Sequence, residues 1–156
     1  MLRVKIIVLG KLKEIYWQSS EVEYLKRLRP YARVDILELL EEPFRDGDDP
    51  EKVKIKEAEK IKKTLHEGEL VIALHERGKE FTSPLFAKFL EEHSTYGETI
   101  VFLVGGPLGL HESILNLAEV QISLSQLTFP HQMVRTILLE QLYRATTILN
   151  EKKYHY

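Results

Sequence analysis

Short apolar runs alternate with longer stretches of helical periodicity along this chain of 156 residues. Five apolar runs, bounded by glycine, proline or charged residues, predict buried strands at 3–9, 33–40, 69–74, 99–104 and 120–124. Apolar residues spaced every three or four positions predict helices over 14–28, 50–66, 111–118 and 131–149, with another beginning at Ser83. This alternation is typical of an α/β fold with a mainly parallel sheet and helices on both faces.

Two helix starts are marked by the same local signal. Asp49 precedes Pro50 and Ser83 precedes Pro84, so each pair offers a capping side chain followed by a proline at the first turn. We expect the helix that begins at Ser83 to bury Leu85, Phe86, Phe89 and Leu90. The acidic segment 41–49, rich in turn-forming residues, should be an exposed loop.

The last helical stretch, 131–149, is apolar on more than one face. One side should pack on the sheet and another elsewhere, which predicts a homodimer. Glu140 and Arg144 are spaced as a helix ion pair, although Arg144 and Arg135 could instead face a phosphate or a base. The terminal Tyr154-His155-Tyr156 is unusually aromatic for a chain end and suggests a tail that folds onto another surface.

Composition narrows the class of protein. With 44% hydrophobic residues the chain should form one domain over 1–156, and without cysteine it can build neither a disulfide nor a thiolate metal site. The formal net charge of −2 excludes a generic polycation for nucleic acid but not a local basic patch. Lysines along 52–63 form either a solvated face or such a patch. The apolar run near the N-terminus is interrupted by Lys5 and is too short to span a membrane, so we expect a soluble, cytoplasmic protein.

Three of the predicted strands end in residues with special chemistry. Leu74, Gly105-Gly106 and Ser125 follow successive strands, and ligands of parallel sheets bind beyond the carboxyl ends of the strands. The glycine turn at 105–109 is neither a dinucleotide fingerprint nor a P-loop. Its glycines allow close backbone approach to a ligand or to another segment of the chain, and the sequence leaves both open.

The segment 123–131 gathers hydroxyl groups, a proline and a histidine at a strand-to-helix junction. Ser125 and Thr128 could bind a ligand or could satisfy local backbone groups. The six histidines lack ligand spacing, so we predict no metal site, and no Ser-His-Asp triad can be argued.

Several motifs carry a resemblance to a known family. They are V-L-G-K-L-K at 8–13, G-G-P-L-G at 105–109, S-L-S-Q-L-T-F-P-H-Q at 123–132, L-L-E-Q-L-Y-R-A at 138–145 and the closing Tyr154-His155. Together they resemble the ribosomal RNA large subunit methyltransferase H family, SPOUT-class enzymes that methylate N3 of a pseudouridine in 23S rRNA. The resemblance implies a C-terminal trefoil knot (the α/β-knot), a homodimer, S-adenosyl-L-methionine held by the knot, and 23S rRNA within the ribosome as substrate.

Position by position, the resemblance assigns cofactor binding to three segments. These are Leu74, Gly105 with Gly106, and the run Ser125, Gln126, Leu127, Thr128, Phe129 and Pro130. This sequence departs from the family pattern at two positions. His75 occupies a position that is often acidic in the family, and the chain ends in Tyr156 where the family usually has a basic residue.

The expected chemistry needs a base, because pseudouridine N3 carries a proton at neutral pH. We expect His155 to act as that base, Tyr154 to orient the nucleotide and Arg144 to stabilise charge or grip phosphate. Two alternatives remain at this level: a SPOUT methyltransferase for another RNA site, and a non-catalytic dimeric module that binds a nucleotide or RNA.

Overall fold

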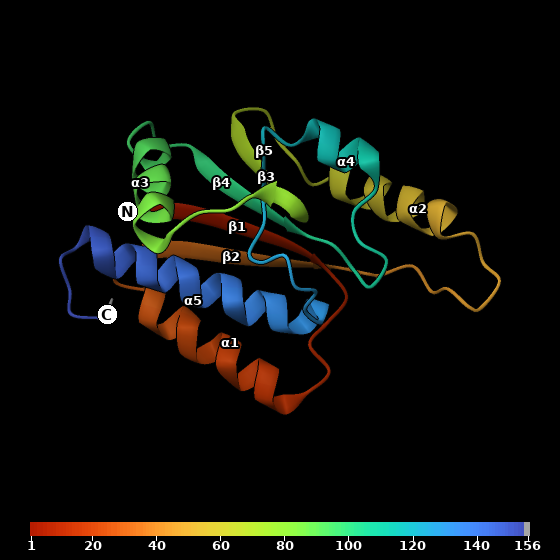
Figure 1. The fold of residues 1–156 in the computed structure, drawn as a ribbon, viewed down its shortest axis with the longest axis horizontal. Coiled ribbons are helices and arrows are strands. Elements are labelled where there is room, and N and C mark those ends of the chain that lie inside the picture. The colour runs from red at the N-terminus through yellow and green to blue at the C-terminus, as the bar shows by residue number, and fades with distance from the viewer. Residues whose placement is uncertain (155–156) are drawn as a thin grey trace.

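A computed structural model, which describes residues 1–154, contains a sheet of five parallel strands (Figure 1). The strand order is β2-β1-β4-β3-β5. Their bounds are β1 (Leu2–Leu9), β2 (Ala32–Leu39), β3 (Glu69–Lys79), β4 (Thr99–Val104) and β5 (Val120–Ile122). Apart from Arg3, Lys5 and Thr99, the residues of the central strands β1 and β4 are apolar and buried, as is typical of strands covered on both faces.

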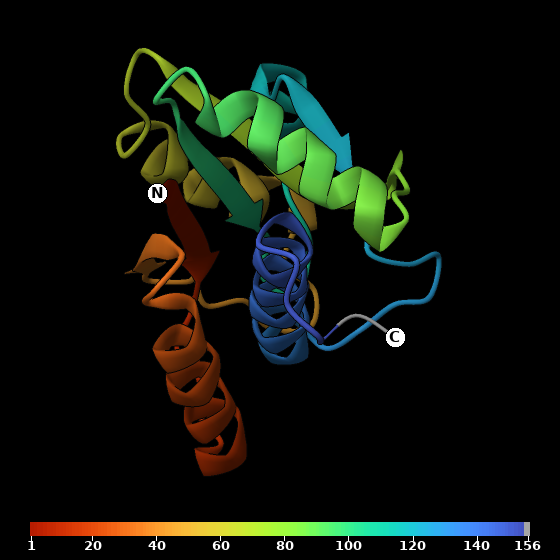
Figure 2. The same cartoon turned by 90° about the vertical axis from the view of Figure 1, so that its left-hand side faces the viewer.

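Helices cover both faces of this sheet, which confirms the predicted α/β architecture. On one face lie α1 (Ile15–Leu28), α3 (Ser83–Ser94) and α5 (His131–Leu149), packed on alternate residues of β1 and β4. On the other lie α2 (Pro50–Lys62) and α4 (Glu112–Leu117). Helices α1 and α5 run side by side (Figures 1 and 2).

The order of the strands makes the end of β4 a topological switch point. The connections that leave β1 and β3 pass through α1 and α3 on one face, whereas the connection that leaves β4 passes through α4 on the other. Loops on either side of β4 therefore diverge and leave a crevice at its carboxyl end. The glycine turn that begins at Gly105 follows directly from this strand.

Most boundaries predicted from the sequence are confirmed to within a few residues, and the Asp49-Pro50 start is confirmed in detail. Asp49 caps α2 by accepting a hydrogen bond from the backbone N–H of Glu51 at 3.0 Å. At α3 the cap is Thr82, which accepts from Leu85 N–H at 3.4 Å, so the expectation of a Ser83 cap was wrong by one residue.

Two further expectations are corrected. Leu85 is 57% exposed rather than buried, because the buried face of α3 is formed by Phe86, Ala87 and Leu90. Strand β3 does not end at Leu74 but continues to Lys79, with a break in its pairing to β5 between those two residues. Its pairing with β4 does stop at Ala73.

A buried ion cluster fixes α5 to the rest of this face. Arg135 in α5 is almost fully buried and pairs with Glu21 of α1 at 2.6 Å and with Glu38 of β2 at 2.7 Å. The guanidinium group of Arg135 donates hydrogen bonds to both carboxylates. The suggestion that Arg135 faces a phosphate or a base is therefore wrong for this conformation.

Within residues 1–154, no helix is long and apolar enough to cross a membrane. The same part of the chain contains no group of three or more histidine or acidic side chains placed to hold a metal ion.

Candidate functional site

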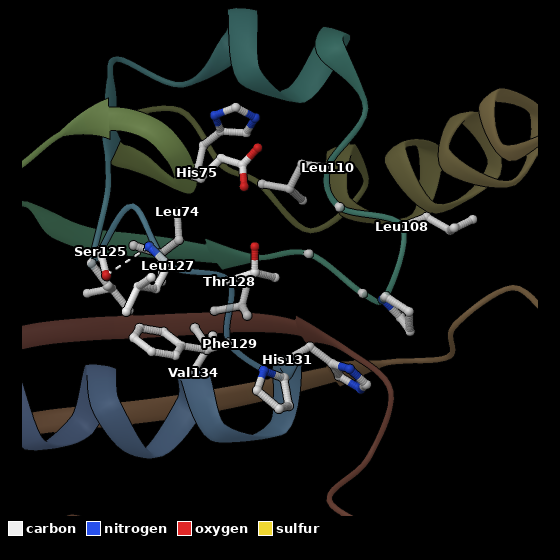
Figure 3. Close-up of a pocket in the computed structure, with 18 of the residues that line it drawn as sticks. Leu74, His75, Leu108, Leu110, Ser125, Leu127, Thr128, Phe129, His131 and Val134 are labelled. Atoms are coloured by element: carbon white, nitrogen blue, oxygen red, sulfur yellow. Dashed lines mark hydrogen bonds between the residues drawn. The ribbon is translucent and has the colours of Figure 1, made fainter.

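A cavity of about 790 Å³ opens at the carboxyl end of β4, where the three predicted segments converge (Figure 3). One wall is the part of β3 just past its pairing with β4, with Leu74 and His75; the second is the glycine turn, and the third is the segment that leads into α5. Of the residues assigned to the cofactor, those lining this cavity are Leu74, Gly105, Gly106, Ser125, Leu127, Thr128, Phe129 and Pro130.

The glycine turn is shaped by its own backbone. Gly109 donates its N–H to the carbonyl oxygen of Gly106 at 2.9 Å, and Gly109 itself has a φ of 81°. A β-carbon on Gly105 would lie 2.9 Å from both the carbonyl carbon of Gly109 and the amide nitrogen of Leu110. Gly105 is therefore required by close approach within the chain, which was one of the two readings left open above.

The atoms around Gly106 differ from those around Gly105. A β-carbon there would meet the Leu9 side chain at 3.6 Å and the carboxylate of Glu57 at 3.7 Å, both ordinary contact distances. The back of this residue is thus covered by β1 and α2, while its backbone lines the cavity. Burial raises the pKa of the Glu57 carboxyl, and so does the charge of nearby Glu41.

Hydrogen bonds within the segment 123–131 occupy both of its serines. Ser123 donates its hydroxyl to the carbonyl oxygen of Ser125 at 2.9 Å, and the Ser125 hydroxyl accepts the N–H of Leu127 at 3.0 Å. Thr128 is different: its hydroxyl points toward the cavity and makes no hydrogen bond within the described chain (Figure 3). The serines thus shape the turn, and Thr128 is the hydroxyl available to a ligand.

The β3 wall is built around a very close crossing of two chain segments. A β-carbon on Gly78 would lie 2.6 Å from the carbonyl carbon of Ile122, so only glycine fits there. Beside it, Ser123 donates its N–H to the carbonyl oxygen of Lys79 at 3.0 Å. His75 lines the cavity, and its Nδ1 accepts the N–H of Arg77 at 3.1 Å.

One assigned residue lies apart from the cavity, and several cavity residues had not been assigned. Gln126 lines a separate, shallower depression with Glu76, Arg77, Gly78 and Glu80. The main cavity also contains residues that had not been assigned to the cofactor. Pro107 and Leu108 belong to the 105–109 motif, Leu124 to the 123–132 motif and Lys54 to the lysines along 52–63, whereas Val104, Leu110 and Val134 showed only apolar or helical periodicity. His131, the first residue of α5 and part of the 123–131 segment, also lines the cavity, although it was not assigned to the cofactor.

The charges of the cavity are mixed in sign. Lys54, paired with Glu51 at 2.7 Å, and Glu76 lie on its walls, and the amino end of α5 faces it through His131. A helix amino end carries partial positive charge and favours anionic groups. At the wall formed by the glycine turn, the Glu57 carboxylate behind Gly106 favours cationic groups of a ligand.

The expected catalytic residues gather elsewhere. Arg144 donates to Glu140 at 2.7 Å, and the Tyr154 hydroxyl donates to the same carboxylate oxygen at 3.2 Å. This cluster lies in the second half of α5, roughly 20 Å along the helix axis from His131 at 1.5 Å per residue. The two sites are therefore separate within one chain. The third candidate, His155, lies outside the described residues.

A mixed-charge cavity at the switch point of a parallel sheet, bounded by a glycine turn, is typical of the α/β class of proteins whose ligand sites lie beyond the carboxyl ends of the strands. A family model described as "Predicted SPOUT methyltransferase" matches residues 2–155. The chain belongs to the SPOUT methyltransferase family, and within it to the group named Ribosomal RNA large subunit methyltransferase H.

Relatives with that name cover the full length of the chain. The protein of Symbiobacterium thermophilum is 44% identical over 160 residues, and that of Acetivibrio thermocellus is 41% identical over 158 residues. The protein of Carboxydothermus hydrogenoformans is 40% identical over 158 residues. In each comparison 99% of this chain and 99% of the relative are covered.

Proposed function

We propose that this protein uses S-adenosyl-L-methionine to methylate N3 of a pseudouridine in 23S rRNA, acting in the cytoplasm on assembled ribosomes. The observation that carries the proposal is the coincidence of two results. The chain matches rRNA methyltransferases from end to end, and the segments that the sequence resemblance assigns to the cofactor meet in one cavity.

The cavity fits such a cofactor in size and chemistry. At about 790 Å³ it is within the range of small-molecule sites, and its walls offer apolar side chains such as Leu74 and Leu110 beside the free hydroxyl of Thr128. The mixed charges suit a ligand that carries both a carboxylate and cationic groups. S-adenosylmethionine supplies an electrophilic methyl group, so the protein has chiefly to orient the acceptor and remove its proton.

We assign removal of the N3 proton and stabilisation of the negative charge that develops on the base to residues near the C-terminus. In this proposal His155 takes the N3 proton, Tyr154 orients the nucleotide and Arg144 stabilises the anionic base or holds a phosphate. The Glu140 carboxylate supports that assignment by fixing both the Arg144 guanidinium and the Tyr154 hydroxyl.

A homodimer resolves the separation between the cavity and this cluster. Because one chain holds them at opposite ends of α5, we infer that the tail of each protomer serves the cavity of its partner. Exposed apolar side chains on α1 support a dimer: Ile15 is 77% exposed and Val22 is 66% exposed. Met133 and Ile137 on α5 are apolar side chains that are also partly accessible.

We also propose that the knot implied by the resemblance is present. The close crossing of Gly78 with Ile122 and the Ser123–Lys79 hydrogen bond support it, because they hold the start of the segment leading to α5 against the last residues of β3. The net charge of the chain supports the ribosome, rather than free RNA, as the substrate. With a net charge of −2, the protein lacks the excess positive charge that would bind free RNA non-specifically.

The decisive experiment is mass spectrometry of rRNA from a strain that lacks the gene. Loss of 3-methylpseudouridine from 23S rRNA, restored by the wild-type gene, is the expected result. An unchanged 23S rRNA with a methyl group missing elsewhere would favour a SPOUT enzyme for another RNA site. A silent calorimetric titration with S-adenosylmethionine, together with unchanged RNA modification, would favour a non-catalytic binding module.

A direct test of the base is His155→Ala in single-turnover methylation of ribosomes with the substrate bound. The proposal expects a large loss of rate. A near-wild-type rate would remove His155 from the chemistry. Efficient methylation of a free rRNA hairpin would contradict the ribosomal substrate.

A further inference from the structure

Glu57 is a carboxylate buried behind the cavity, and the proposed reaction gives it no role. It lies in the middle of α2 and is only 4% exposed. A β-carbon on Gly106 would lie 3.7 and 3.9 Å from its two carboxylate oxygens. The carboxylate thus lies against Gly106, which lines the cavity.

Two more carboxylates and one lysine lie near Glu57. Its Oε2 accepts the backbone N–H of Glu42 at 3.2 Å, and the Glu42 carboxylate pairs with Lys60 at 2.7 Å. The Glu41 carboxylate lies against Gly10, 3.0 Å from where a β-carbon would be. Three carboxylates therefore gather at the carboxyl ends of β1 and β4, with Lys60 paired to one of them.

Packing alone does not explain a charged residue here. Burial raises the pKa of Glu57, and the charges of Glu41 and Glu42 raise it further, while the Glu42 N–H and Lys60 lower it. A buried carboxylate gives up hydration, and uncharged side chains of similar volume are often equally or more stabilising at such positions. The charge thus carries a cost that the fold does not require, which points to a role at the adjacent cavity.

We propose that Glu57 determines ligand specificity by placing a negative potential behind the glycine turn, so that the cavity prefers a cationic ligand to its neutral counterpart. This inference rests on the proposed function, in which the cofactor carries a sulfonium and its product, S-adenosylhomocysteine, carries a neutral thioether. The two ligands otherwise have the same charged groups. A buried charge acts over several ångströms with little screening by salt, so it can favour replacement of product by fresh cofactor.

The test is calorimetric binding of S-adenosylmethionine and S-adenosylhomocysteine to the wild-type protein and to two matched variants. Glu57→Gln keeps the shape and the acceptor for Glu42 N–H but removes the charge. Glu59→Gln removes the same charge from the exposed face of the same helix. In Glu57→Gln we expect affinity for S-adenosylmethionine to fall on the order of tenfold while that for S-adenosylhomocysteine stays within about twofold. Glu59→Gln should change neither.

Equal effects on both ligands in Glu57→Gln, or no effect on either, would overturn the inference. Thermal melting checks that this variant is folded. If it is not, Lys60→Gln decides, because loss of this cation should increase the preference for S-adenosylmethionine, and an unchanged or reduced preference would refute the role of Glu57. Failure of the wild-type protein to bind S-adenosylmethionine would instead refute the proposed function.

Discussion

The guanidinium of Arg144 lies over the ring of Tyr154, with its central carbon 4.9 Å from the ring centroid. The ring also packs edge-on against Tyr143 at 4.8 Å between centroids. These contacts place Tyr154 on the second half of α5, away from the cavity of the same chain. The other two residues of the predicted tail, His155 and Tyr156, lie outside the described residues.

The separation of Arg144 from the cavity predicts distinct effects on binding and on catalysis. Arg144→Ala should leave the affinity for S-adenosylmethionine within about twofold of wild type but lower single-turnover methylation of ribosomes on the order of a hundredfold, as for loss of one charge-stabilising donor. Arg33→Ala, which removes an exposed arginine paired only with Asp35, is the matched control. A parallel loss of cofactor affinity in Arg144→Ala would contradict the assignment.

Mixed dimers test whether the tail acts on the partner's cavity. Thr128→Trp should fill the cavity from an exposed position without unfolding the protein. Co-assembled Thr128→Trp and Arg144→Ala subunits should regain activity that neither homodimer has, because one site combines an intact cavity with an intact tail. Inactive mixed dimers would show that each tail serves its own chain.

The phenol of Tyr154 should remain protonated throughout the pH range of an assay. Burial, helped by Tyr24 and Glu140, raises its pKa to about 12. Because the folded-state pKa is above the unfolded value of about 10, its contribution to stability is complete below pH ~10 and is lost as pH rises toward 12. Difference titration of tyrosinate absorbance against Tyr154→Phe should show one phenol near this pKa.

The buried Arg135 cluster should contribute far more to stability than an exposed pair. Arg135→Ala leaves Glu21 and Glu38 without their shared cation, and removal of one member of a buried pair costs about 3–5 kcal/mol. Arg27→Ala breaks an exposed pair with Glu23 on α1 and should lower stability far less. Urea unfolding of both variants measures the difference. Similar midpoints would show that the cluster is not a stabilising anchor.

The two adjacent glycines of the turn should respond differently to alanine. Gly105→Ala forces a β-carbon against the backbone of Gly109 and Leu110, so we expect a loss of about 2 kcal/mol or more in the free energy of unfolding. Gly106→Ala places its methyl at ordinary contact distances and should cost about 1 kcal/mol or less. Equal destabilisation of the two variants would contradict this account of the turn.

Local signals in the sequence determined most of the secondary structure and the place of the cavity. Asp49-Pro50 marks a helix start because the cap and the proline act within one turn, and the apolar runs mark strands because period and burial are properties of neighbouring residues. The carboxyl ends of parallel strands share one edge, so Leu74, Gly105 and Ser125 could be brought together without knowing the strand order.

Only the tertiary structure decided which distant residues meet. Arg135 pairs with Glu21 and Glu38, each more than ninety positions away along the chain, and Glu57 lies behind Gly106. Both contacts depend on where the helices lie, and the order of the strands sets the positions of the helices. The extension of β3 past Leu74 likewise depends on the approach of β5 to Gly78. The distance between the Arg144–Tyr154 cluster and the cavity follows from the length of α5, since a straight helix cannot bring its two ends to one site.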